Sequence, residues 1–222
     1  MNLSSMFAIA AACISCASPA KAAEPFDFRG IKLGITIDEL RTTPHPDGEL
    51  QASAVVVCSY DQPSHYAVAV TEEEAAIGVR TCAYFLPGQG VLSLLEPAPI
   101  KVGGRETTKK ITFSFIEDPQ DHSSRLFRIM VPVGIDAEGD VEDALIGRFG
   151  PPVSAEENTA HTLMGAAIPR KTLSWTNQES SILLQAPFAR VDDMMVLYLD
   201  SRLSKYKDEL MQQAKGPPEG RM

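Results

Sequence analysis

Residues 140–152 read DVEDALIGRFGPP and contain the start, the apolar face and the stop signal of one short helix. Asp140 is predicted to cap the first backbone amides, with Asp143 in the place of the acidic member of a capping box. Gly150 can adopt the left-handed conformation that ends a helix, and the two prolines after it prevent continuation. Strand-like stretches lie on both sides, so the helix is predicted to cover a sheet. Its apolar face consists of Val141, Ala144, Leu145 and Phe149.

Short strand-like stretches account for most of the remaining pattern. Ile111, Phe113 and Phe115 occupy every second position, which is the period of a half-buried strand, and the apolar residues of 127–131 repeat it on one face. Residues 154–171 are polar and show little periodicity. Further strands are predicted at residues 54–59, 79–86, 91–95, 173–175, 182–184 and 194–199.

Two more helices are predicted, one near each end of the chain. Thr36 and Glu39 have the spacing of a capping box at the start of the first. Ser201 is expected to cap the second, which covers residues 202–215 and precedes a tail, residues 216–222, that is expected to be disordered.

The order of these elements predicts an α+β fold, with an antiparallel sheet and a few short covering helices. Strands that come in runs, with few helices between them, do not suit a parallel βαβ arrangement. Residues 24–135 and residues 136–215 each begin with a short capped helix and continue into strands. The chain is therefore predicted to contain two similar α+β halves.

Residues 1–22 have the pattern of a cleaved secretory signal peptide. Residues 6–14 are an apolar run, and small residues lead from it to the cleavage motif AKA at residues 20–22. The first five residues contain no Lys or Arg, and Cys13 offers an alternative as the modified cysteine of a lipoprotein. Because the apolar run is short for a lipoprotein leader, the sequence predicts a periplasmic or secreted protein.

Removal of this leader would leave two of the four cysteines, Cys58 and Cys82. In an oxidising compartment two cysteines most simply form one disulfide, which on the chain-entropy account contributes about 3–4 kcal/mol for a loop of this length. A reactive or metal-binding pair is the alternative. Neither residue lies in a C-x-x-C motif, and two thiols alone do not complete a zinc site.

The chain is acidic, with 20 basic and 29 acidic side chains and a formal net charge of −9. Such a field repels phosphate backbones, so nucleic acid is not an expected partner. No apolar run reaches the roughly 18 residues of a membrane-spanning helix, and no transmembrane segment is predicted.

The local signatures of common enzyme classes, G-x-S-x-G, H-E-x-x-H and the P-loop, do not occur. A secreted hydrolase in which a loop histidine converges on a nucleophile is kept as an alternative. Calcium binding by residues 72–74 or by Asp192 and Asp193 is a less favoured hypothesis than a solvated turn, because no alternating Asp/Asn loop with a glycine is present. No catalytic residue, metal ligand or cofactor is assigned. Four histidines lie in polar loops and are expected to face solvent: His45, His65, His122 and His161.

Trp175 is the single tryptophan and lies in an alternating strand. Together with Phe149 and Tyr198 it could line an apolar pocket for a small ligand. Core packing is the favoured interpretation, because a lone tryptophan in such a strand normally supplies buried area.

Two segments resemble the helix openings of SmpA/OmlA (BamE-like) envelope domains. They are GITIDEL at residues 34–40 and VEDAL at residues 141–145, the latter followed by FGPP at 149–152 and by Trp175. The tandem form of that architecture is similar to the β-lactamase inhibitor protein fold. The resemblance implies small α+β modules that bind other envelope or extracellular proteins and are not enzymes. From the leader pattern, the single cystine and the lack of a catalytic cluster, we expect an exported, non-enzymatic binding or envelope-interaction protein.

Overall fold

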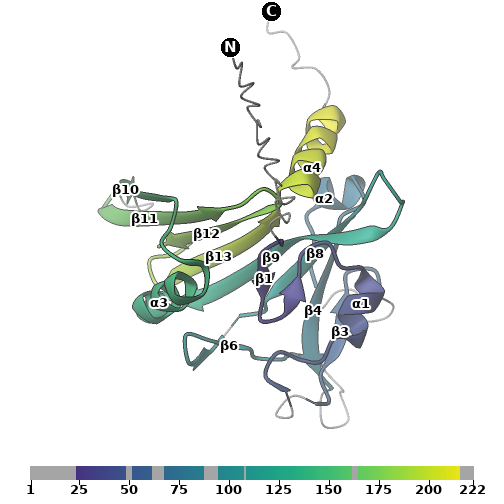
Figure 1. The fold of residues 1–222 in the computed structure, drawn as a ribbon, viewed down its shortest axis with the longest axis horizontal. Helices are drawn as coiled ribbons and strands as arrows, with labels where there is room; N and C mark the ends of the chain where they lie inside the picture. Colours follow the sequence, from purple (N-terminus) through teal and green to yellow (C-terminus); the bar gives the residue numbers. More distant parts are fainter. Residues whose placement is uncertain are drawn as a thin grey trace, which may run out of the picture.

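The computed structural model describes residues 24–48, 52–61, 68–87, 95–107, 109–161 and 165–215, and these form an α+β fold (Figure 1). The helices are α1 (Ile37–Thr42), α2 (Glu72–Ala76), α3 (Glu138–Phe149) and α4 (Ser201–Ala214), with a 3-10 turn, η3 (Ile135–Ala137), before α3. The strands are β1 (Asp27–Phe28), β2 (Ile31–Lys32), β3 (Val55–Cys58), β4 (Arg80–Leu86), β5 (Glu96–Pro97), β6 (Lys101–Val102), β7 (Arg105–Glu106), β8 (Thr112–Glu117), β9 (Ser124–Gly134), β10 (Ser154–His161), β11 (Ala167–Thr176), β12 (Ser180–Ala186) and β13 (Asp193–Asp200). The predicted fold class is confirmed, whereas the predicted signal peptide, 1–22, and tail, 216–222, lie outside the described residues.

One antiparallel sheet of nine strands organises the described part of the chain, in the order β10-β11-β12-β13-β9-β8-β4-β3 with β5 beside β4. It consists of two groups of four strands, and each group follows a helix, α1 or α3. The last strand of each group, β9 and β13, pair at the centre, with Gly134 opposite Asp193 and Arg128 opposite Leu199. Residues from both halves of the sequence therefore share one continuous sheet.

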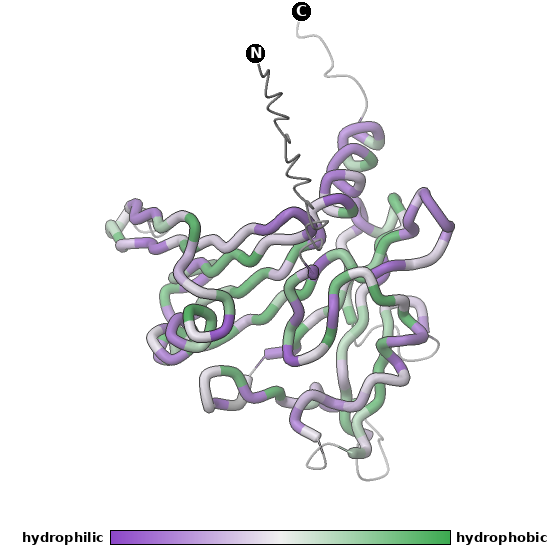
Figure 2. The backbone as a smooth tube through the Cα atoms, viewed as in Figure 1, coloured by the Kyte–Doolittle hydropathy of each residue, from purple (hydrophilic) through white to green (hydrophobic). Residues whose placement is uncertain are grey.

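The two faces of this sheet carry separate apolar clusters. The main cluster joins the sheet to α1, α3 and the β1–β2 hairpin, and it includes Leu40, Phe113, Phe115, Ile129 and Ile182. The second cluster contains Val79, Ile116, Phe127 and Leu203. Because successive strand residues point to opposite faces, the neighbours Phe115 and Ile116 place α4 on the reverse side from α3. Figure 2 shows hydrophobic residues concentrated along the central strands and hydrophilic ones along much of α4.

A β-bulge explains why one residue of the predicted alternation in 127–131 faces the other side. Ser114 pairs with Arg128, but Phe115 pairs with Leu126, so Phe127 is the extra residue of β9. Phe127 consequently packs under α4, while Ile129 stays in the main cluster. The prediction that these residues share one face was wrong for Phe127.

The helix ends follow local chemistry in most places. Thr36 and Glu39 form the predicted capping box of α1, and Gly150, with φ +82°, follows the last residue of α3. The predicted caps of α3 and α4 were wrong. α3 continues directly from η3 and begins at Glu138, which leaves Asp140 inside the first turn, where its charge suits the helix dipole. For α4 the capping side chain is Asp200, which accepts a 2.8 Å hydrogen bond from the backbone N–H of Leu203.

The sequence left one polar stretch, 154–171, without a predicted structure. Its described residues form the exposed edge strand β10 and the first part of β11. The predicted disulfide is present: Cys58 and Cys82 lie directly opposite each other on β3 and β4, and both are fully buried. Among the described residues, no helix combines the length and the apolar character needed to cross a bilayer.

Candidate functional site

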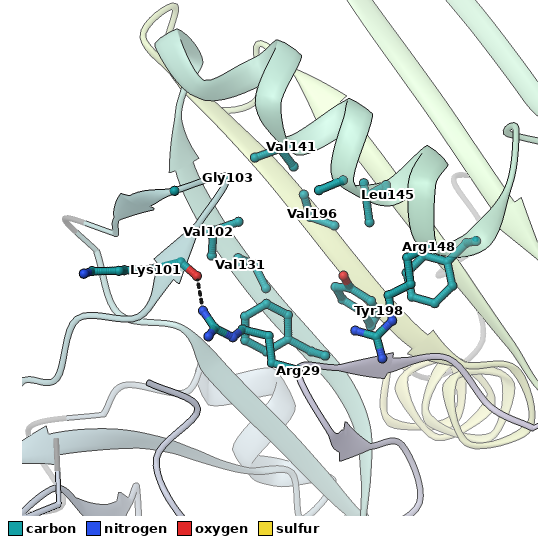
Figure 3. A pocket seen from close by; sticks show the side chains of 14 residues that line it. Arg29, Lys101, Val102, Gly103, Val131, Val141, Leu145, Arg148, Val196 and Tyr198 are labelled. Atoms are coloured by element: carbon teal, nitrogen blue, oxygen red, sulfur yellow. Dashed lines mark hydrogen bonds between the residues drawn. The ribbon is translucent and has the colours of Figure 1, made fainter. Parts of the chain in front are cut away.

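A pocket of about 410 Å³ lies between α3 and the central strands of the sheet (Figure 3). Its floor is formed by β9 and β13, its roof by α3, and its sides by β1 and the β6–β7 hairpin. We call it the α3 pocket. It lies where the two halves of the sequence meet, because β9 comes from the first half and α3 and β13 from the second.

The wall of the α3 pocket is mainly apolar because the apolar residues of the helix and of the strands recur on the faces that meet there. Val141 and Leu145 are four residues apart on α3, so both side chains reach the sheet. Val131 and Val196 pair directly across β9 and β13 and form the floor beneath them. Phe28 closes the side below α3. The spacing of apolar residues on α3, predicted from the sequence, therefore builds one wall of a cavity as well as a core.

One polar group lies within this apolar surface, the phenol of Tyr198. Its side chain is on the same face of β13 as Val196, and its ring packs edge-on against Phe28 at 5.7 Å. Tyr198 is only 5% exposed, and its hydroxyl donates no hydrogen bond to any described residue. Figure 3 shows the oxygen directed into the pocket, toward α3. Burial raises the pKa of Tyr198, so the hydroxyl stays protonated and can donate.

Three cationic residues are among those that line the α3 pocket, Arg29, Lys101 and Arg148, and Figure 3 shows the Lys101 ammonium directed away from the cavity. Arg29 forms an ion pair with Asp47 at 2.8 Å and donates a 2.5 Å hydrogen bond to the carbonyl oxygen of Lys101. The Nη2 atom of Arg148 lies 2.5 Å from Asp27. The lysine ammonium contacts no carboxylate among the described residues. Each arginine at the mouth is thus paired with one carboxylate, and Lys101 adds one positive charge beside the mouth.

The β6–β7 hairpin closes one end of the pocket through a close backbone approach. Gly103 has φ +58°, and a Cβ atom there would lie 3.1 Å from side-chain carbons of both Asp140 and Val141. A glycine is therefore required for the hairpin to rest against the first turn of α3. This contact joins the hairpin to the helix that forms the roof.

The structure brings together two of the three residues considered for an apolar pocket. Phe149 and Tyr198 both line the α3 pocket, whereas Trp175 is not among its lining residues. Trp175 is buried at 2% exposure, and its indole Nε1 donates a 2.8 Å hydrogen bond to the carbonyl oxygen of Gly150. It holds the end of α3 from behind the pocket.

His45 does not face solvent as expected. Its loop folds onto the sheet, where its ring packs edge-on against Tyr84 at 5.1 Å, and its Nδ1 accepts a 3.2 Å hydrogen bond from the backbone N–H of Asp47. Burial lowers the pKa of His45 and disfavours its charged form.

The other described histidines are exposed and lie elsewhere, while His65 falls outside the described residues. His122 is in the β8–β9 turn, with its Nδ1 3.0 Å from Glu117, and His161 ends β10. Among the described residues, no hydrogen bond joins a histidine to a serine, threonine or cysteine side chain.

The acidic residues considered for calcium have cationic partners or lie apart. Glu74 of α2 pairs with Arg128 at 2.9 Å, and Asp193 pairs with Lys109. Within the described ranges no group of three or more His, Cys, Asp or Glu side chains is arranged to hold a metal ion.

Sequence reasoning did not find the cationic residues at the pocket mouth. Arg29 and Lys101 belong to short hairpins whose only local signal is glycine, at Gly30 and at Gly103 and Gly104. Nothing in either hairpin indicates that it packs beside α3. Comparison of the chain with protein-family models, with curated proteins and with solved structures finds no match in any of the three.

Proposed function

We propose that this chain is an exported binding protein without catalytic activity, and that the α3 pocket is its ligand site. Export rests on the leader pattern of residues 1–22, and the buried Cys58–Cys82 disulfide fits an oxidising compartment. The pocket has the volume and the mainly apolar lining, with few polar groups, that are typical of small-molecule sites.

The observation that carries the proposal is the hydroxyl of Tyr198, which opens into the α3 pocket. The residue is only 5% exposed, and among the described residues its hydroxyl has no hydrogen-bond partner. A ligand oxygen placed in the pocket would accept a hydrogen bond from this hydroxyl, which gives the mainly apolar cavity one specific polar contact.

Binding to the pocket is tested with a neutral apolar fluorescent probe, N-phenyl-1-naphthylamine. Ala144→Phe places a ring in the pocket from an exposed position on α3, and we expect it to weaken probe binding about tenfold or more. Ile146→Phe is the matched control, because Ile146 is on the same helix but does not line the pocket. Equal probe affinity in both variants and the parent protein would place the site elsewhere and overturn the proposal.

Export is tested separately by mass spectrometry of the protein from its native host. We expect a chain that lacks residues 1–22 and has no free thiol. An intact initiator methionine together with two reduced cysteines would contradict this part of the proposal.

A second candidate function, binding of an envelope protein, is supported by the face of the sheet opposite α3. Three half-buried apolar residues lie side by side there on adjacent strands, since Leu197 of β13 pairs with both Leu183 and Met130. The arrangement of two helix-led groups of four strands also fits a tandem of small modules, as the SmpA/OmlA resemblance implies. Leu197→Arg should abolish recovery of an envelope partner by cross-linking in the native host, while the probe still binds the α3 pocket. Unchanged cross-linking would remove this candidate.

A further inference from the structure

We infer that the ligand of the α3 pocket is an amphipathic monocarboxylate, with its apolar body under α3 and its carboxylate between Tyr198 and Arg148. This inference rests on the proposed function and adds the chemical class of the ligand. It follows from three features of the pocket: its apolar wall, the position of the phenol donor in that wall, and the charges around its mouth.

The first feature places the body of the ligand. Val131, Val141, Leu145 and Val196 surround the deep part of the pocket without a polar side chain among them. An alkyl chain or a ring gains about 25 cal/mol for each Å² of apolar surface that it removes from water there. A fully polar ligand, such as a sugar, would leave its hydroxyls without partners along this wall.

The second feature places an oxygen atom of the ligand. The Tyr198 hydroxyl is the donor within the apolar wall, and it lines the same pocket as Arg148, which pairs with Asp27. Figure 3 shows the guanidinium of Arg148 on the side of the pocket where the phenol lies. Among the described residues Arg148 donates one hydrogen bond, from Nη2 to Asp27, and a guanidinium has five N–H groups. An acceptor beside Tyr198 can therefore also receive a hydrogen bond from Arg148.

The third feature gives the charge of the ligand. Arg29 and Arg148 are the cations at the mouth, and each pairs with one carboxylate, Asp47 or Asp27. The one further positive charge nearby is the Lys101 ammonium, which is directed away from the cavity, so the surroundings of the pocket match a monoanion better than a doubly charged phosphate. A carboxylate also presents the two oxygens that an arginine side chain and a phenol can share.

The experiment measures binding of octanoate, octan-1-ol, octylamine and octyl phosphate to the full mature chain by displacement of the neutral probe, below the micellar range. We expect octanoate to bind about tenfold more tightly than the alcohol and the amine, because hydrogen bonds to charged groups contribute more than neutral ones. Tighter binding of octyl phosphate than of octanoate would overturn the assignment of a carboxylate.

Two variants test the position of the headgroup. Tyr198→Phe keeps the ring and removes a hydroxyl that has no hydrogen-bond partner among the described residues, so the fold should be retained. It should weaken octanoate about tenfold relative to octan-1-ol, with both affinities measured against the probe affinity of that variant. Arg148→Gln should do the same, whereas Arg190→Gln, at an exposed ion pair with Asp192, should leave the ratio of the two affinities unchanged. Octanoate affinity that is insensitive to Tyr198→Phe and Arg148→Gln would refute the inference.

The outcomes separate the inference from the proposed function. If the probe binds in the α3 pocket but octanoate has no advantage over the alcohol, the pocket is a ligand site of another class and only the inference fails. If the probe does not bind, or if Ala144→Phe has no effect on it, the proposed function fails as well.

Discussion

The indole Nε1 of Trp175 donates a 2.8 Å hydrogen bond to the carbonyl oxygen of Gly150, the residue that follows the last turn of α3. Trp175 is on β11, so the bond holds the end of the helix against the second group of strands. Phe149, which lines the α3 pocket, is the preceding residue. The position of one pocket wall therefore depends on a side chain that does not touch the pocket.

Replacement of this tryptophan should be destabilising. Trp175→Phe removes the donor, leaves the Gly150 carbonyl without this partner and creates a small cavity, so we expect a loss of about 2–3 kcal/mol in the free energy of unfolding. Urea unfolding followed by far-UV circular dichroism measures it, since the variant has no tryptophan. Tyr198→Phe is the control, because it also removes one polar atom but breaks no bond to a described residue. Equal losses in both variants would show that the Gly150 bond has no special role.

The disulfide should contribute strongly to stability. Cys58 and Cys82 join neighbouring strands at the end of the sheet farthest from β10, and the loop between them contains α2. Cys58→Ala together with Cys82→Ala should lower the free energy of unfolding by about 3 kcal/mol, through greater freedom of the unfolded chain. Denaturant titration measures this loss, and reduction of the unfolded parent protein should reproduce it. A change below about 1 kcal/mol would mean that the strand pairing alone holds this edge.

The Asp118 carboxylate should make the free energy of unfolding depend on pH in the acidic range. This carboxylate is almost fully buried and accepts hydrogen bonds from both terminal nitrogens of Arg202. These hydrogen bonds lower the pKa of Asp118 to about 2. Arg125 is a second cation close to Asp118, at 3.7 Å. An aspartate in the unfolded chain has a pKa of about 3.9, so this stabilisation is complete above that value and is lost as the pH falls toward 2.

We expect the interaction to contribute about 1–2 kcal/mol at neutral pH, a range that allows for solvent screening at the half-exposed Arg202. Urea unfolding at pH 6 and pH 3 should show Asp118→Asn less stable than the parent at pH 6, with a smaller difference at pH 3. Asp121→Asn, in the same hairpin but more exposed, is the control and should change stability less at pH 6. A difference between Asp118→Asn and the parent that stays constant with pH would contradict the assignment.

The contact between the β6–β7 hairpin and α3 gives a test of pocket shape. Gly103→Ala should push the hairpin away from Asp140 and Val141, because its Cβ would lie 3.1 Å from carbons of both. Gly104→Ala has the same left-handed backbone but no atom within 4 Å, so it should show only the backbone cost of about 1 kcal/mol. Gly103→Ala should lose more stability and also weaken the fluorescent probe. Identical behaviour of the two variants would mean that the hairpin does not shape the pocket.

Local features of the fold were accessible from the sequence because each depends on residues a few positions apart. The Thr36–Glu39 capping box and the stop of α3 at Gly150 are set by backbone amides and carbonyls that only near neighbours can reach. The predicted start of α3 was wrong because the chain enters the helix from η3 instead of from an extended segment. The predicted orientation of Phe127 was wrong because of a bulge in β9. A bulge depends on how β9 pairs with β8, and the periodicity of one strand carries no information about that pairing.

Amino-acid order alone therefore accounts for the α+β class, the antiparallel strands and the two cysteines that pair, since periodicity, caps and cysteine number are properties of the linear chain. The α3 pocket arises only when β9 pairs with β13, which brings Val131 beside Val196 and sets Tyr198 beneath the helix. Arg29 and Arg148 are more than a hundred positions apart, and both reach the pocket mouth only through packing of their separate elements. Contacts over such distances depend on strand order and on the shape of the core, so no window of sequence contains them.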